Sequence, residues 1–153
     1  MRIKFQLDLK PFSINKAYYR DRRIKTRDFV DWEMCVIQQL NRPEIQAELA
    51  KLRAAYKPSL HGFSVSLRFY FPRDLLLNKQ GLISSRAEDL SNIEKALLDL
   101  LFLPKIHVQS PPYGAPNVNC DDKSVLALHS YKLPSADNSH HIAVSIRLVN
   151  FSR

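Results

Sequence analysis

Residues 63–71 form the pattern that most constrains the fold, because apolar side chains there recur at every second position. Five apolar residues are separated by polar ones: Phe63, Val65, Leu67, Phe69 and Phe71 alternate with Ser64, Ser66 and Arg68. A period of two is typical of a β-strand, whose successive side chains point to opposite faces of a sheet. Alternation also predicts strands at 3–9, 125–133 and 142–149, so the chain is expected to build a sheet.

Helices are predicted by a second kind of spacing, in which apolar residues recur every three or four positions. Three segments have this spacing: 26–40, 43–56 and 91–102. Thr26 is expected to cap the first helix, and Pro43 suits the first turn of the second. Ser91 and Glu94 fit a capping box at the start of the third helix.

The predicted order is strand, two helices, strand, helix and two strands, in a chain of 153 residues. This length fits one compact domain spanning residues 1–153. The order indicates an α+β fold in which helices pack on a mixed or mostly antiparallel sheet. Residues 134–140 are predicted to be a hairpin loop between the last two strands, whereas 73–88 and 104–119 are predicted to be irregular.

Positive charge is concentrated at the start of the chain. The formal net charge is +8, and residues 1–27 hold nine Lys or Arg against two Asp. The remaining residues hold fourteen basic and thirteen acidic side chains. The excess lies beside Tyr18 and Tyr19, which favours a polyanion-binding surface, with a solvated face as the plainer alternative. A membrane surface is disfavoured because this segment lacks an amphipathic helical period.

Composition argues against several classes of protein. Three glycines are too few for a Gly-rich phosphate loop, so Walker and Rossmann sites are not expected. Cys35 and Cys120 are the only cysteines and form no CxxC pair, which argues against a thiolate zinc site and a disulfide framework. Because no apolar run suits a signal peptide or a membrane span, a cytoplasmic protein without a membrane partner is expected.

Carboxylates at the ends of predicted elements indicate where metal chemistry would lie. Asp89 precedes the third predicted helix and Asp99 lies on it. The pair Asp121–Asp122 precedes a strand. Mg²⁺ prefers hard oxygen ligands, and Lys95 on the same helix could neutralise charge on a phosphate. Plainer interpretations stay open, namely a helix-dipole partner, a turn and a solvated lysine.

The arrangement resembles the RusA family of Holliday-junction resolvases in three blocks. The blocks are Ser13-Ile14-Asn15-Lys16-Ala17-Tyr18-Tyr19, then Asp89-Leu90-Ser91-Asn92-Ile93-Glu94-Lys95 followed by Asp99, and Asp121-Asp122 ahead of Lys132. The second block matches the family's D-x-D-N-x-x-K…D motif at every spaced position but one. The order of blocks and strands agrees over most of the chain, while residues 41–57, 73–87 and 104–119 look like insertions.

The resemblance implies a homodimer that cuts four-way or branched DNA by paired nicks near the crossover, as in DNA recombination and repair. It implies a requirement for Mg²⁺, with Mn²⁺ as a possible substitute, in the cytoplasm of a bacterial or phage-infected cell. The implied catalytic region spans about residues 88–132. Carried over by position, its residues are the metal ligands Asp89, Asp122 and Asp121, the phosphate-facing base Lys95, and the supporting Ser91, Asn92 and Asp99.

Ser91 departs from the resemblance, since the family's best-known form has aspartate there. A hydroxyl is a much poorer Mg²⁺ ligand than a carboxylate. One interpretation keeps an active enzyme, in which Asp89, Asp122 and a third acid hold the ion. The retained Asn92 and Lys95 favour this interpretation. The alternatives are a catalytically inactive binder of branched DNA on the same fold, and a basic adaptor for nucleic acid or protein.

The basic loop at about residues 13–27 is predicted to bind DNA. The residues expected to contact phosphates or stack on bases are Ser13, Asn15, Lys16, Tyr18, Arg20, Arg22, Arg23, Lys25 and Arg27. Lys and Arg side chains suit backbone phosphates, and tyrosine rings suit unpaired bases. For Ser13 and Asn15, the organisation of a turn is an equally good interpretation.

Overall fold

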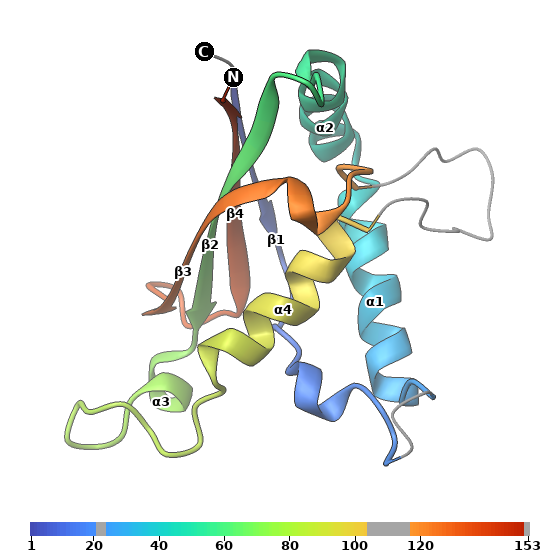
Figure 1. Cartoon of the computed structure of the whole chain (residues 1–153). Coiled ribbons are helices and arrows are strands. Elements are labelled where there is room, and N and C mark those ends of the chain that lie inside the picture. Colours follow the sequence, from blue (N-terminus) through green and yellow to red (C-terminus); the bar gives the residue numbers. More distant parts are fainter. Residues whose placement is uncertain (21–23, 104–116, 152–153) are drawn as a thin grey trace.

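A computed structural model shows an α+β domain in which helices cover one face of a four-stranded sheet (Figure 1). It describes residues 1–20, 24–103 and 117–151. In chain order the elements are β1 (Arg2–Leu7), the 3-10 turn η1 (Ile14–Lys16), α1 (Arg27–Leu40), α2 (Pro43–Ala55), β2 (His61–Phe71), α3 (Arg73–Leu76), α4 (Leu90–Leu101), the 3-10 turn η2 (Asp122–Ser124), β3 (Val125–Pro134) and β4 (His141–Asn150). The α+β class expected from the sequence is confirmed.

The sheet is mixed, with strand order β1-β4-β2-β3. β4 runs antiparallel to both β1 and β2, whereas β3 runs parallel to β2. The predicted hairpin at 134–140 is therefore wrong, because β2 lies between β3 and β4. Parallel neighbours need a crossover connection, and α4 lies in the one between β2 and β3. β2 pairs along both of its edges, which suits the long apolar alternation of its sequence.

The hydrophobic core lies between the sheet and the helices. Phe63 of β2 is fully buried, and its ring centroid lies 5.3 Å from that of Phe102, so β2 contacts the end of α4. Burial of one such side chain stabilises the fold by roughly 1.5–3 kcal/mol. Trp32 of α1 is buried as expected, and its indole N–H donates to the Lys10 carbonyl at 2.7 Å. No helix in the described ranges has the length and apolar character needed to cross a membrane.

The start predicted for α1 is confirmed, whereas the start predicted for α4 is wrong. Thr26 caps α1, and its hydroxyl accepts the N–H of Phe29 at 3.3 Å. The capping box predicted from Ser91 is wrong, because Asp89 is the N-cap of α4 and Ser91 lies inside the first turn. Asp89 occupies the N-cap position without a side-chain capping bond, and this earlier start lets Leu90 pack against the core.

The segment predicted to be irregular at 73–88 contains a short helix and a tight turn. α3 occupies its start, and an isolated β-bridge joins Leu77 to Ile83. The side chain of Asn78 accepts two backbone N–H bonds inside this turn, each at 3.0 Å. Gly81 adopts a φ of 77°, a left-handed conformation that favours glycine. The segment is thus a compact loop on the surface.

Candidate functional site

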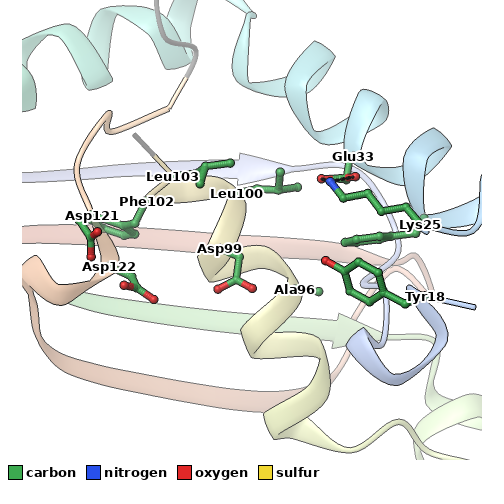
Figure 2. A pocket seen from close by; sticks show the side chains of 11 residues that line it. Tyr18, Lys25, Glu33, Ala96, Asp99, Leu100, Phe102, Leu103, Asp121 and Asp122 are labelled. Atoms are coloured by element: carbon green, nitrogen blue, oxygen red, sulfur yellow. Dashed lines mark hydrogen bonds and ion pairs between the residues drawn. The ribbon is translucent and has the colours of Figure 1, made fainter. Parts of the chain in front are cut away.

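A pocket of about 270 Å³ lies at the carboxyl-terminal end of α4 (Figure 2). Four parts of the chain line it: the segment before α1, α1 itself, the end of α4 and the turn before β3. The lining residues are Tyr18, Lys25, Phe29, Glu33, Ala96, Asp99, Leu100, Phe102, Leu103, Asp121 and Asp122. Three of the acids singled out in the sequence, Asp99, Asp121 and Asp122, therefore line one pocket, which we call the acidic pocket.

Helix α4 and the turn η2 bring these acids together. Asp99 lies near the end of α4, and Asp122 is the first residue of η2. Asp121 caps η2, and its carboxylate accepts the backbone N–H of Lys123 at 2.9 Å. The pKa of Asp121 is lowered, first by this N–H and then by the neighbouring Asp122 side chain. Asp121 is therefore ionised at neutral pH and its oxygens can act as hard ligands.

Asn117 fixes the chain that leads into the acidic pocket, and sequence reasoning missed it. Its side chain is fully buried and donates to the carbonyls of Leu100 and Leu103 at 2.7 and 2.8 Å. The guanidinium of Arg53 donates to the Asn117 carbonyl at 2.7 Å. Asn117 thus satisfies one carbonyl that the last turn of α4 leaves without a partner, that of Leu100, and a second just beyond the helix, that of Leu103. These bonds hold the approach to Asp121 against α4. Its place four residues before Asp121 was the available clue.

Two residues of the basic segment, residues 13–27, line another wall of the acidic pocket, namely Tyr18 and Lys25. Tyr18 and Lys25 face each other across an isolated antiparallel bridge. The ammonium of Lys25 lies 2.9 Å from Glu33 and 5.4 Å from the centre of the Phe29 ring. The Tyr18 ring meets the Phe29 ring edge-on, with centroids 5.8 Å apart. These contacts hold a cation and an exposed tyrosine beside the acids.

Other predicted DNA contacts of the basic segment fall into three groups. Ser13 is buried, and its hydroxyl donates to the Asn15 side chain at 2.5 Å, which is the arrangement of a turn. Lys16 is exposed and pairs with Glu88 at 2.9 Å. Of the four predicted arginine contacts, Arg20 and Arg27 are exposed. The other two, Arg22 and Arg23, lie outside the described residues.

The amino-terminal end of α4 forms a separate location. Asp89 is exposed there and is not part of the acidic pocket. It lies ten residues before Asp99, which corresponds to about 15 Å along a helix at 1.5 Å per residue. Lys132, near the end of β3, donates to the Glu88 carbonyl at 2.7 Å. The structure therefore places Asp99, and not Asp89, in the pocket that Asp122 also lines.

Lys95 lies between the two ends of α4. Its ammonium approaches Asp99 to 3.4 Å, one helical turn along, and both side chains are substantially exposed. A positive charge can therefore reach the rim of the acidic pocket. Ser91 and Asn92 remain with Asp89 in the first turn of the helix, where Ser91 is exposed and Asn92 is half-buried.

The donor set of the acidic pocket suits a hard divalent cation held by few protein ligands. The described part of the chain holds no group of three or more His, Cys, Asp or Glu side chains that could together bind a metal ion. Mg²⁺ requires fewer protein ligands than that, because it is usually held by one or two carboxylates together with waters and substrate phosphates. The neighbouring Asp121 and Asp122, both exposed, meet that smaller requirement.

Comparison with known proteins gives no family for this chain, because no protein-family model and no curated protein matches it. The chemistry open to the acidic pocket is therefore set by its own residues. It combines exposed carboxylates, a nearby ammonium group and a wall of basic and aromatic side chains. This combination suits a negatively charged substrate and a divalent cation together.

Proposed function

We propose that the protein is a Mg²⁺-dependent endonuclease acting on branched DNA, with its chemistry in the acidic pocket. The observation that carries this proposal is that Asp99, Asp121 and Asp122 line the same pocket as Tyr18 and Lys25. Cationic side chains on the basic segment would bind the DNA backbone, and the acids would supply the ligands for the cation. Neither feature alone would favour a nuclease over other functions.

The chain's own residues have distinct roles in the proposed reaction. Asp121 and Asp122 would hold Mg²⁺, which when bound supplies Lewis-acid polarisation of the scissile phosphate. Lys95, beside Asp99, would neutralise negative charge that develops on that phosphate. Exposed Arg20 and Arg27 would contact the flanking backbone. In this assignment Asp89 is not a metal ligand, which differs from the ligand set implied by the family resemblance.

The resemblance to RusA resolvases supports a four-way junction as the substrate. Paired nicks in such a junction need two active sites, so the proposal includes a homodimer with one acidic pocket on each chain. DNA recombination and repair in the cytoplasm, with Mn²⁺ able to replace Mg²⁺, belong to the same proposal.

A second candidate is a protein that binds branched DNA without cutting it. The position of Asp89 favours this candidate, since the two acids that the resemblance pairs as ligands, Asp89 and Asp122, lie toward opposite ends of α4. Ser91 favours it as well, because a hydroxyl is a poor substitute for a carboxylate ligand. The basic segment would remain as the DNA-binding surface.

Cleavage of a synthetic four-way junction, with and without Mg²⁺ or Mn²⁺, separates the two candidates. The enzyme is expected to make symmetric nicks that require a divalent ion and that Asp122→Asn abolishes. Asp31→Asn is a matched control, because Asp31 is an exposed aspartate of α1 that does not line the acidic pocket. Tight, salt-dependent binding with no cleavage in either ion would reject the nuclease and favour the second candidate.

A further inference from the structure

The face of the sheet that the helices leave uncovered carries a row of cations. Buried residues of β1, β2 and β4 point toward the helices, so their neighbours along the strand point the opposite way. The register of β3 with β2 places His129 and Tyr131 on the same side as Ser66 and Arg68. We call this second surface the open face. Its exposed members are Arg2, Lys4, Gln6, Arg68, His129, Tyr131 and Arg147. Strand pairing sets them side by side, with Arg2 opposite Arg147 and Arg68 opposite Tyr131.

Positive charge on the open face is unbalanced. The four strands contain no Asp or Glu. Across the described ranges, none of Arg2, Lys4, Arg68 and Arg147 forms an ion pair. Like charges placed opposite each other destabilise a sheet, as Arg2 and Arg147 are here. A bound polyanion would remove that repulsion.

The open face also has the shape and the ring surfaces to hold a strand of nucleic acid. A groove of about 580 Å³ runs over it, and two small residues, Ser66 and Ser145, line the groove where they pair across β2 and β4. Tyr131 at its side is 47% exposed, and the Arg68 guanidinium lies 5.9 Å from the ring centre. Unpaired bases stack on such exposed rings and on guanidinium planes.

We propose that the open face binds single-stranded nucleic acid, with bases stacked on Tyr131 and phosphates held by Arg2, Lys4 and Arg147. A second copy of the chain is a poor occupant, because a symmetric contact through this face would set arginines against arginines. Duplex is a poorer occupant than a single strand, because its bases cannot stack on the tyrosine ring. The proposal is independent of the acidic pocket, which lies on the helix side of the sheet.

Binding of a fluorescent twenty-nucleotide oligo-dT, followed by anisotropy, tests the contribution of the ring. Tyr131→Ala is expected to weaken binding by about tenfold, whereas Tyr131→Phe, which keeps the ring, should bind as the wild type does. Lys57→Ala is the control for loss of a cation elsewhere, since Lys57 is exposed and lies outside the strands. Circular dichroism and melting would establish that each variant is folded. Unchanged affinity in folded Tyr131→Ala would overturn the proposal.

Photocross-linking locates the strand directly. An oligonucleotide carrying 5-iododeoxyuridine should cross-link to peptides from β2 or β3, in particular the one that contains Tyr131. Cross-links confined to the basic segment would overturn the proposal. Conversion of a dimer into a monomer by Arg68→Glu, with strand binding intact, would overturn it too, because the face would then join two copies. Junction cleavage is a separate readout, so a failure of the proposed nuclease would leave these results interpretable.

Discussion

The two ends of α4 differ in how their acidic groups are used. At the carboxyl-terminal end, Asp99, Asp121 and Asp122 line a pocket beside the basic segment. At the amino-terminal end, Glu88 is engaged twice, by the Lys16 ammonium at its carboxylate and by Lys132 at its carbonyl. A protein cation thus pairs with Glu88 at one end and with Asp99 at the other, whereas Asp121 and Asp122 form no ion pair within the described residues.

This difference shows that residues of one sequence motif can lie at separate locations in the fold. The stretch from Asp89 to Asp99 reads as one unit in sequence, but a helix separates its two ends by about 15 Å. Only the end that meets η2 acquires additional carboxylates. The amino-terminal end has an exposed aspartate, and its Glu88 pairs hold the basic segment and β3 near the helix start.

The largest expected effect comes from a pair of substitutions, one at each end of α4. Asp122→Asn should lower junction cleavage at least about a hundredfold, because a bound metal ion supplies several kcal/mol of transition-state stabilisation. Asp89→Asn should change the rate by no more than about twofold, as for a surface substitution away from the chemistry. Single-turnover cleavage rates measure both. Equal losses would contradict this contrast and would require the two ends to meet across subunits.

Asn117→Ala is expected to destabilise the carboxyl-terminal end selectively. The buried Leu100 carbonyl of α4 and the part-buried Leu103 carbonyl just beyond it lose their donor, and a buried group left unsatisfied costs about 1–3 kcal/mol. Urea unfolding would measure the change in free energy. Asn92→Ala is the counterpart near the amino-terminal end, where Asn92 is half-buried, and should cost less. A larger loss for Asn92→Ala would reverse the comparison.

Lys95→Ala separates a chemical role from a structural one. The exposed pair with Asp99 spans four residues, and such a pair stabilises a helix by no more than about 0.5 kcal/mol. Loss of a charge facing the phosphate should nevertheless slow cleavage by about tenfold, since one charge contact at a protein surface is worth about 1–4 kcal/mol. Thermal melting and cleavage rates are to be compared. A rate unchanged in Lys95→Ala would remove Lys95 from the proposed chemistry.

The smallest effect concerns the titration of Asp121. Its pKa lies below the ordinary value of 3.8 because the Lys123 N–H favours the carboxylate. A lowered pKa in the folded state means that ionised Asp121 favours folding above about pH 4, and that this contribution is lost as the pH falls through the folded value. Carbon-13 NMR of the side-chain carboxyl should give a lower midpoint in the folded chain than in urea. A midpoint equal to or above the urea value would contradict the assignment.

Much of the fold follows from local sequence. The alternation over 63–71 predicts β2, and Thr26 predicts the start of α1, because periodicity and caps depend on neighbouring residues. The order of the strands does not follow, since pairing of β2 with both β4 and β3 is decided between distant segments. The predicted hairpin between 134 and 140 was wrong for that reason.

The candidate site was only partly predictable. The sequence singled out Asp99, Asp121 and Asp122, but it could not show that these three line one pocket while Asp89 lies outside it. Which end of α4 faces η2 depends on the crossover between β2 and β3. The anchoring role of Asn117 depends on carbonyls left free at the end of α4, which no spacing rule reveals.

The pairing of β2 with β3 also sets when the acidic pocket can appear during folding. Phe63 is aligned with Val125, sixty-two positions later in the chain. Contacts of such long range close slowly, because the loop entropy is lost before the contact is gained. Asp121 and Asp122 directly precede β3, so they reach Asp99 only when this strand docks. Recovery of the proposed metal binding after dilution from denaturant would therefore report when β3 docks.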